Sequence, residues 1–317
     1  MKAIILGING QDGPYLAKLL LSKGYEVWGT SRDAQVSPHS NLSTFGIADK
    51  VRLISMAPND FRSVLTALDR SDPDEIYNLA GQSSVGLSFD MPAETLESFV
   101  SATLNILESI RLRKKPVRFY NAGSSECFGD TNNLPADETT LFHPRSPYAV
   151  AKASAHWLVS NYREAYGLYA CTGILFNHES SLRPARFVTQ KIIQSAKRIA
   201  NGSDEKLNLG CVNIHRDWGL AEEFVEAMWL MLQNSAPEDI VIATGKTYGL
   251  DAFVAEAFRV FGLEWNEHVV VNDSLKRPSD IAYSRANPTR ARQSLGWEAR
   301  SAMPEVVRIM AEGRLFA

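Results

Sequence analysis

Two short segments carry side chains that could catalyse proton transfer. Tyr148 and Lys152 stand four residues apart, so on a helix they lie on one face. There the ammonium of Lys152 would stabilise the Tyr148 phenolate and lower the phenol's pKa, which suits it as a base for a sugar or alcohol hydroxyl. About one helix upstream, Ser124 and Glu126 follow a predicted strand. The set predicts acid–base chemistry on a hydroxylated substrate, with an ordinary surface Tyr and Lys as the alternative.

A third segment, at the start of the chain, has the composition of a phosphate-binding turn. Gly7, Gly10 and Gly13 follow the apolar run 3–6 and precede leucines at helical spacing. Glycines let the backbone turn sharply and approach a pyrophosphate, and the following helix offers free N–H donors. The same glycines could form a simple tight turn, but their place after a buried strand favours a dinucleotide site. The G-x-x-G-x-x-G spacing is typical of short-chain dehydrogenase/reductase proteins.

The end of the second predicted strand indicates which dinucleotide is bound. Strand 26–30 is followed by Ser31, Arg32 and Asp33. An acidic residue at the strand end would accept from the ribose 2′-hydroxyl of NAD, whereas an arginine suits the 2′-phosphate of NADP. Arg32 therefore favours NADP. NAD stays the alternative, because Asp33 could oppose a phosphate and Arg32 could be a solvated surface charge.

Strands and helices alternate along the first half of the chain. Strands are predicted at 3–6, 26–30, 51–54, 75–79 and 117–121, and helices at 61–70, 93–113 and 147–166. This alternation implies right-handed crossovers and predicts an α/β fold with a doubly wound parallel, Rossmann-like sheet. Strand C-terminal ends face the ligand crevice in such sheets, so we expect Ser124 and Glu126 to point at one site.

The pattern changes after residue 175. A helix at 187–200, a strand at 206–209 and a helix at about 220–233 precede shorter mixed elements. We therefore expect a smaller, interleaved α/β substrate lobe. The predicted division places 1–175 in the dinucleotide domain, with about 212–245 returning to it, and 176–211 with 246–317 in the substrate lobe.

Composition excludes several classes of function. The 317 residues carry a formal net charge of −3, which gives no global electrostatic reason to bind nucleic acid or an anionic membrane. No run approaches the roughly 20 apolar residues that span a bilayer. The dispersed Cys127, Cys171 and Cys211 and the scattered histidines predict a reducing compartment and no metal site. The expected location is cytoplasmic.

Several longer motifs make the likeness specific. Over nearly its whole length the chain resembles the GDP-mannose 4,6-dehydratases, a family of extended short-chain dehydrogenases/reductases. The motifs that carry the resemblance are the Gly-Gln-Asp-Gly turn at 10–13, Asn-Leu-Ala-Gly-Gln-Ser at 78–83, Ser-Ser-Glu at 124–126, Pro-Arg-Ser-Pro-Tyr at 144–148 with Lys152, Leu-Phe-Asn-His-Glu-Ser at 175–180, Phe-Val-Thr-Gln-Lys at 187–191, Arg-Asp-Trp-Gly at 216–219 and Arg-Pro at 277–278.

The resemblance implies a mechanism for the first set of residues. Tyr148, assisted by Lys152, would remove the C4 hydroxyl proton while the C4 hydride passes to the nicotinamide, and Ser124 would bind that oxygen. Glu126 would then abstract the C5 proton and protonate the departing C6 hydroxyl. Return of the hydride to C6 would give a 4-keto-6-deoxy sugar. A simple reductase needs no carboxylate at position 126.

The resemblance also implies a role for residues outside this set. The implied cofactor site comprises Gly7, Gly10, Gln11, Asp12, Gly13, Arg32, Leu79, Ala80, Gly81, Gln82, Ser83, His178 and Arg183. The implied site for the diphosphate or guanosine of a GDP-sugar comprises Ser84, Asn177, Lys191, Arg216 and Arg277. Cations suit a diphosphate, although each basic residue could equally form a surface ion pair.

The sequence departs from the family pattern in four places. Ser124 stands where the family has Thr, which preserves a hydroxyl, whereas segment 55–58 lacks the family's adenine-contacting Asp. Loop 32–41 lacks paired arginines that in relatives hold NADP and a neighbouring subunit. We therefore expect a homodimer, built on helices 93–113 and 147–166, before a homotetramer. Residues 184–186 and Gln190 also differ around the sugar-nucleotide loop.

These departures keep other functions open. The substrate could be a related GDP-sugar, such as a heptose or an N-acetylhexosamine. On the same scaffold, a GDP-4-keto-6-deoxyhexose reductase or a nucleotide-sugar epimerase is the next alternative. A protein of another class, a non-catalytic dinucleotide sensor, would have no need for Ser124, Glu126, Tyr148 and Lys152 together.

Overall fold

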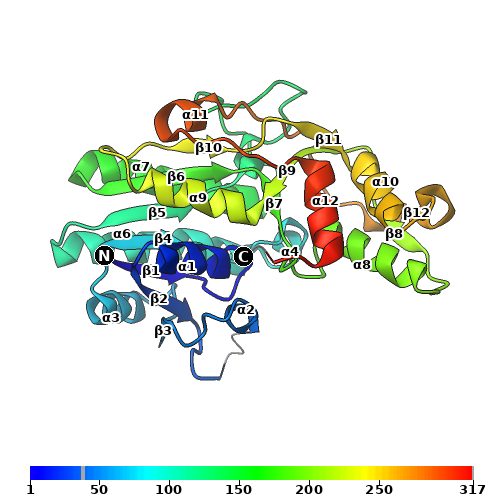
Figure 1. Cartoon of the computed structure of the whole chain (residues 1–317). Coiled ribbons are helices and arrows are strands. Elements are labelled where there is room, and N and C mark those ends of the chain that lie inside the picture. Colours follow the sequence, from blue (N-terminus) through cyan, green and yellow to red (C-terminus); the bar gives the residue numbers. More distant parts are fainter. Residues whose placement is uncertain (37–39, 316–317) are drawn as a thin grey trace.

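The computed structural model describes residues 1–36 and 40–315, which form a large and a small lobe (Figure 1). Seven strands make the main sheet of the large lobe, in the order β10-β6-β5-β4-β1-β2-β3, and every neighbouring pair is parallel. Their bounds are β1 Lys2–Leu6, β2 Glu26–Ser31, β3 Val51–Ser55, β4 Glu75–Asn78, β5 Arg118–Ala122, β6 Tyr169–Leu175 and β10 Ile240–Ile242. The predicted doubly wound, Rossmann-like fold is confirmed. Part of loop 32–41 lies outside the described residues.

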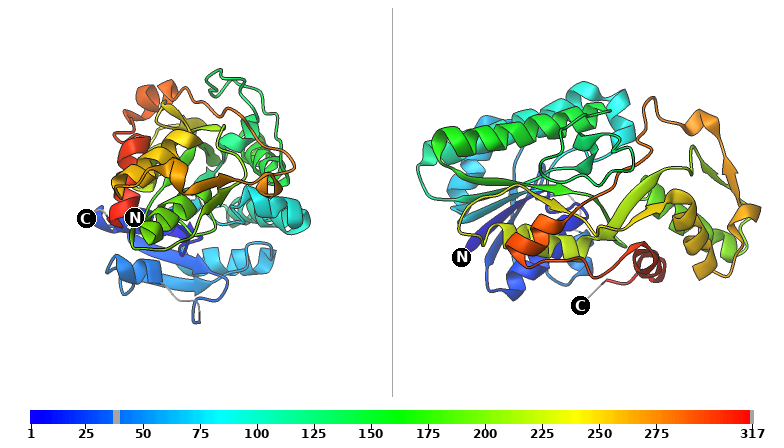
Figure 2. Two further views of the ribbon diagram at one scale, coloured as in Figure 1. Left: turned by 90° about the vertical axis from the view of Figure 1, so that its right-hand side faces the viewer. Right: turned by 90° about the horizontal axis from the view of Figure 1, so that it is seen from above.

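Helices cover both faces of the main sheet (Figures 1 and 2). One face packs against α1 Asp12–Ser22, α2 Ser40–Thr44, α9 Ala221–Met231 and α11 Thr289–Leu295, and the other against α3 Phe61–Ser71, α6 Ala102–Arg113 and α7 Pro147–Tyr166. Strands buried on both faces are rich in apolar residues. This explains why Ala3, Ile4, Ile5 and Leu6 of β1 are all fully buried.

The helical path before β5 is not regular. The prediction of one α-helix over 93–113 was wrong in this respect, because a π-helical turn, η1 Glu97–Ser101, separates α5 Pro92–Leu96 from α6. Phe99 of this turn is buried against Tyr148, with the two ring centroids 5.5 Å apart in an edge-on contact. Such π-turns occur frequently at functional sites, where they re-aim a side chain.

The small lobe lies beyond the carboxyl ends of the parallel strands (Figure 2). It has a three-stranded sheet, β11-β9-β7, and a two-stranded one, β12-β8. Its elements are β7 Asn177–Glu179, α8 Val188–Ala200, β8 Leu207–Leu209, β9 His215–Leu220, β11 Thr247–Gly249, α10 Leu250–Val260, η3 Trp265–Glu267, β12 Val269–Val271, η4 Asp273–Leu275 and α12 Met303–Glu312. Within segment 212–245, α9 and β10 lie on the large lobe, whereas β9 belongs to the small one.

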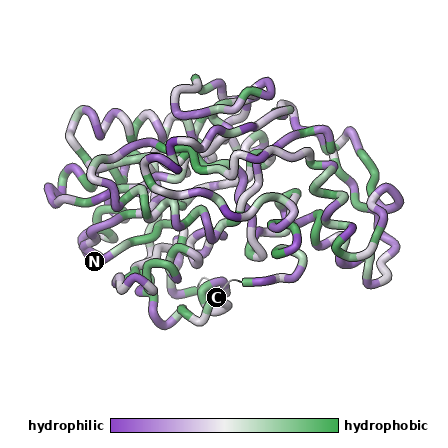
Figure 3. Tube along the Cα trace, turned by 45° about the horizontal axis from the view of Figure 1, so that its top comes forward, coloured by the Kyte–Doolittle hydropathy of each residue, from purple (hydrophilic) through white to green (hydrophobic). Residues whose placement is uncertain are grey.

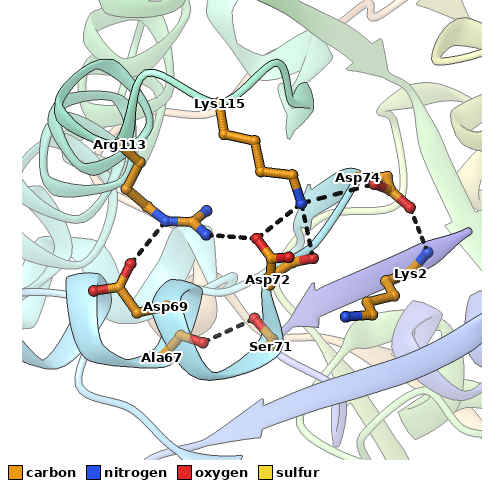
Figure 4. A network of polar contacts seen from close by, with 8 residues as sticks. All are labelled: Lys2, Ala67, Asp69, Ser71, Asp72, Asp74, Arg113 and Lys115. Carbon is orange, nitrogen blue, oxygen red and sulfur yellow. Dashed lines mark hydrogen bonds and ion pairs between the residues drawn. The ribbon is translucent and has the colours of Figure 1, made fainter.

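A charged cluster holds the amino ends of the strands together (Figure 4). Asp72 ends α3 in a left-handed conformation and accepts from Lys115 Nζ at 2.8 Å and from Arg113 Nη2 at 3.0 Å. Asp74 accepts from the backbone N–H of Lys2 at 2.8 Å. These contacts join α3, α6 and β1 at the end of the sheet away from the small lobe, so the cluster is structural.

Apolar stretches along the chain are short (Figure 3). Within residues 1–36 and 40–315, no helix is both long and apolar enough to cross a bilayer. The core is instead divided among inward-facing side chains of the two lobes. In the small lobe these include Trp218, Phe253 and Phe258, all buried.

Candidate active site

A cavity of about 830 Å³ lies where the carboxyl ends of the parallel strands meet the small lobe. All four residues expected to do chemistry line it: Ser124, Glu126, Tyr148 and Lys152. All of the predicted cofactor residues line it as well: Gly7, Gly10, Gln11, Asp12, Gly13, Arg32, Leu79, Ala80, Gly81, Gln82, Ser83, His178 and Arg183. Ser84, Asn177, Arg216 and Arg277 complete the wall.

Lys191 is the exception among the predicted substrate residues. It lies exposed on α8, and its Nζ donates to the carbonyl oxygen of Asn208 at 2.7 Å. The neighbouring Ile192 and Ile193 are buried in the small-lobe core, which turns Lys191 to the opposite side of the helix. The structure therefore does not bring Lys191 into the cavity.

The cavity also contains residues to which the sequence analysis assigned no role in the site. Asn59, Arg186, Thr189 and Trp218 all line it. Trp218 follows Arg216 by two positions on β9, so the two side chains project from the same face of the strand. The two-residue alternation of side chains along a strand, counted from Arg216, could therefore have predicted that Trp218 lines the cavity. No comparable signal marked Asn59.

Tyr148 and Ser124 form a buried pair on the large-lobe side of the cavity. Ser146 caps the helix that carries Tyr148, its Oγ accepting from the N–H of Ala149 at 3.1 Å. Burial raises the pKa of the Tyr148 phenol, and the hydrogen bond with the Ser124 hydroxyl partly offsets this. The pKa is therefore raised, whereas the Tyr–Lys spacing predicts a lowered one.

Lys152 is held in place by Ala122 and Phe99 rather than by Tyr148. Its Nζ donates to the carbonyl oxygen of Ala122 at 2.7 Å and lies 4.0 Å from the ring centroid of Phe99. The same nitrogen is 5.9 Å from the centroid of the Tyr148 ring. Burial lowers the pKa of Lys152 to about 8, so it remains largely protonated near neutral pH. The irregular turn at Phe99 thus helps to fix the ammonium next to the phenol.

Glu126 lines the same cavity as Tyr148 and Lys152. It belongs to the short helix η2 Ser125–Phe128, and its backbone N–H donates to Ser124 Oγ at 3.3 Å. The side chain is half-buried. Burial raises the pKa of Glu126, while the positive charges of Arg216 and Arg277 partly oppose the increase. A carboxyl with a raised pKa can both accept and return a proton near neutral pH.

Two guanidinium groups reach the cavity from the small lobe. Asp280 Oδ1 lies 3.3 Å from Arg216 Nη2 and 3.8 Å from Arg277 Nη1. Arg216 also donates to the carbonyl oxygen of Ile281 at 2.8 Å, which fixes it although it is almost fully buried. Paired guanidinium groups of this kind suit an anion such as a diphosphate.

The glycine turn fits a dinucleotide. Gly7 has a φ of +87°, and a Cβ there would lie 3.0 Å from the backbone of Ala80. A Cβ on Gly13 would lie 2.5 Å from the carbonyl oxygen of Ile8, so the start of α1 can pack against the turn that follows β1 only because residue 13 has no side chain. The N-terminus of α1 opens on the cavity through Gly10 and Asp12. The turn therefore leaves room for a pyrophosphate beside free N–H groups.

Solved structures of other proteins share the fold of this chain. DesIV, a dTDP-glucose 4,6-dehydratase from Streptomyces venezuelae, matches with a TM-score of 0.88 at 18% identity, covering 99% of this chain and 96% of that one. A UDP-glucose 4-epimerase from Thermus thermophilus matches with a TM-score of 0.87 at 22% identity, covering 99% and 98%. Fold, glycine turn and Tyr–Lys pair together make the chain an extended short-chain dehydrogenase/reductase.

Sequence comparison identifies the family within this class. The family model "GDP-mannose 4,6 dehydratase" matches residues 4–310. "GDP-mannose 4,6 dehydratase 1" of Arabidopsis thaliana is 42% identical over 320 residues, covering 98% of this chain and 88% of that protein. The human GDP-mannose 4,6 dehydratase is 40% identical over 333 residues, covering 97% and 90%. The chain belongs to the GDP-mannose 4,6-dehydratase family.

Proposed function

We propose that the chain dehydrates GDP-mannose to GDP-4-keto-6-deoxymannose, with NADP as its cofactor. The observation that carries the proposal is the meeting of Ser124, Glu126, Tyr148 and Lys152 at one cavity. Membership of the family supplies the substrate, since relatives named for this activity align along nearly the whole chain.

The residues divide the chemistry between them. Tyr148 acts as the phenolate, which Lys152 stabilises, and becomes a neutral phenol when it takes the proton of the C4 hydroxyl. Ser124 donates to the C4 oxygen as it becomes a carbonyl. A bound nicotinamide would accept the C4 hydride and supply a hydride to C6. The C4 ketone acidifies the C5 proton, which Glu126 removes and delivers to the C6 hydroxyl, so that water leaves. Hydride addition at C6 is matched by protonation of C5, for which Tyr148 holds the proton that it took from the C4 hydroxyl. The result is a 4-keto-6-deoxy sugar without net redox change.

Glu126 separates this function from those of related enzymes. A reductase or an epimerase needs Tyr148 and Lys152 but no group that moves a proton from C5 to C6. The raised pKa of Glu126 supports the elimination role, because the same carboxyl must act first as base and then as acid. Arg216 and Arg277, whose charges act on Glu126, would bind the substrate diphosphate, and Asn177 lines the same cavity.

Incubation with GDP-mannose and substoichiometric NADP tests the function directly. We expect a keto-sugar, detected by its absorbance in alkali, with no net change in NADPH. A stoichiometric demand for NADPH would indicate a reductase instead. Turnover of another GDP-sugar in preference to GDP-mannose would change the substrate, and failure with a panel of GDP-, dTDP-, UDP- and CDP-sugars would favour the non-catalytic sensor.

The preference for NADP rests on the residues that follow β2. Arg32 lines the cavity, whereas Asp33 Oδ1 accepts from the backbone N–H groups of Gln35 and Val36, both at 3.1 Å. The Asp33 carboxylate is therefore engaged in its own turn. We expect Arg32→Ala to weaken NADPH binding about tenfold or more and to leave NADH binding unchanged. The loss corresponds to the free energy of one charge-assisted hydrogen bond to a phosphate. Fluorescence titration of the two cofactors measures the difference; equal losses for both would contradict a 2′-phosphate contact.

The glycine turn provides a second prediction, with a matched control. Gly13→Ala should weaken NADPH binding at least tenfold and destabilise the fold by about 1–3 kcal/mol, because the added Cβ meets the Ile8 carbonyl and pushes α1 away. Gly24, at the end of the same helix, has a φ of +80° and open space around it. Gly24→Ala should cost about 1 kcal/mol in unfolding free energy and leave NADPH affinity intact. Thermal unfolding and fluorescence titration compare the two variants.

The helices around α7 offer a surface for the expected homodimer. Leu87 of α4 Val85–Asp90, Leu104 of α6 and Val150 of α7 are all more than a third exposed. We expect Leu104→Glu to convert a dimer to a monomer, seen as a halved mass in analytical ultracentrifugation, because it buries a charge in an apolar interface. Leu141→Glu, at a loop position that is 87% exposed, is the control and should leave the mass unchanged. A dimer that survives Leu104→Glu would place the interface elsewhere.

A further inference from the structure

The phosphate-binding turn contains an acidic residue. Asp12 is the first residue of α1 and lines the cavity next to Gly10 and Gly13. A helix N-terminus favours an anion, but a carboxylate placed there competes with a pyrophosphate and repels it. The surroundings of Asp12 must therefore compensate its charge if the turn is to bind a dinucleotide.

His178 reaches Asp12 from the small lobe. Its Nε2 lies 3.0 Å from Asp12 Oδ2, and its Nδ1 lies 2.8 Å from the carbonyl oxygen of Phe176. Neither an ionised carboxylate nor a carbonyl can donate, so each ring nitrogen must carry a proton to make its bond. The contacts describe an imidazolium. The ring of Phe224 stacks on it at a centroid distance of 4.7 Å and helps fix its orientation.

The electrostatics of the pair agree with this geometry. Burial raises the pKa of Asp12, but His178 opposes it strongly enough to bring that pKa down to about 2. Burial lowers the pKa of His178, but the charge and hydrogen bond of Asp12 outweigh it and raise that pKa overall. Gln11 adds a bridge: its Nε2 donates to Asp12 Oδ1 and to the carbonyl oxygen of His178, both at 3.0 Å.

The other charged groups nearby do not replace His178. Arg183 also lowers the pKa of Asp12, but less than His178 does, and its charge opposes the protonation of His178. Its Nε donates to Glu179 Oε2 at 2.6 Å. Lys152 is close enough for Asp12 to affect its pKa, but its Nζ is bound to the carbonyl oxygen of Ala122. Asp12 also acts on the phenols of Tyr15 and Tyr120, whose pKa values burial raises, so they bring no positive charge.

We propose that His178 is a positioning residue, held as an imidazolium that neutralises Asp12 and ties the phosphate-binding turn of the large lobe to β7 of the small lobe. Through this pair, the turn accepts a pyrophosphate without repulsion from its own carboxylate. The inference rests on the proposed function only in requiring that a nicotinamide dinucleotide binds at the turn; it is independent of which sugar is the substrate.

A double-mutant cycle on NADPH affinity tests the pairing. His178→Gln leaves the carboxylate uncompensated, and we expect about 30- to 100-fold weaker binding, the effect of one unpaired charge facing a phosphate. Asp12→Asn removes the repelling charge and should change affinity by less than about fivefold. The decisive variant combines both changes and should bind NADPH more tightly than His178→Gln alone. Additive losses, or weaker binding by the double variant, would overturn the proposal.

A spectroscopic measurement on the unaltered chain does not depend on these variants folding. At about pH 8 an ordinary histidine, with a pKa of about 6.5, is neutral. ¹⁵N-histidine NMR should show both ring nitrogens of His178 protonated at that pH, with the resonances assigned by their loss in His178→Gln. A neutral His178 would overturn the proposal. Failure of the wild-type chain to bind NADPH would instead overturn the proposed function, and the NMR result would still report the charge of His178.

Discussion

Glu126→Gln is expected to lower the rate of dehydration by a factor of about 10³ or more and to leave the first oxidation step intact. The amide keeps the shape of the side chain but can neither accept the C5 proton nor donate one to the C6 hydroxyl. Tyr148, Ser124 and Lys152 remain in place, so the C4 hydroxyl is still oxidised. Reduced nicotinamide should accumulate in an amount equal to the enzyme, visible by its near-ultraviolet absorbance, with no product released.

The control for this variant is a carboxylate away from the cavity. Glu256 of α10 pairs with Arg259 at 2.7 Å on the outside of the small lobe, and Glu256→Gln should retain full turnover.

The wild-type rate should also fall as the pH drops through the pKa of Glu126, because the base must be ionised to act. Burial raises that pKa, so this acid limb lies above the range of an ordinary glutamate. Undiminished keto-sugar formation by Glu126→Gln would contradict the assignment.

Tyr148→Phe is expected to block the reaction one step earlier, again by about 10³-fold or more. Without the phenol oxygen nothing accepts the C4 hydroxyl proton, so neither product nor reduced nicotinamide should form. This absence of a near-ultraviolet signal distinguishes it from Glu126→Gln. The ring is retained and still packs edge-on against Phe99, so we expect the melting temperature to change little.

Tyr162 offers a matched control on the same helix. Its hydroxyl donates to Glu108 Oε1 at 2.6 Å, between α7 and α6, and it does not line the cavity. Tyr162→Phe should lower thermal stability slightly and keep turnover within about twofold, since only a partly exposed hydrogen bond is lost. A large loss of activity in Tyr162→Phe would mean that α7 itself is displaced by such changes, and Tyr148→Phe would then not prove a chemical role.

Some errors of the sequence reasoning have a common physical origin. Lys191 belongs to a motif shared with the family, yet the buried Ile192 and Ile193 turn it away from the cavity. The Tyr148–Lys152 spacing predicts a lowered phenol pKa, whereas burial raises the pKa of Tyr148. In the first case the outcome depends on which side of α8 is buried, and in the second on how deeply the Tyr148 phenol is buried. Both depend on elements that are distant in the sequence.

The sequence by itself determined the features that follow from local pattern. Apolar runs separated by helical periodicity indicate a parallel sheet, because strands buried on both faces consist mainly of apolar residues. Glycines at 7, 10 and 13 indicate a close approach of backbone to phosphate, and the four-residue spacing of Tyr148 and Lys152 places them on one helix face. Each of these inferences needs only the geometry of a single strand, turn or helix.

Only the tertiary structure decided which charges meet. Asp12 and His178 are 166 positions apart in the sequence, and Glu126 senses Arg216 and Arg277 from the other lobe. No local sequence period predicts these contacts, because they depend on the position of the small lobe at the carboxyl ends of the strands. Burial then strengthens each electrostatic interaction by excluding water. The identities of the reacting groups were therefore readable from the sequence, whereas their protonation states were set by the fold.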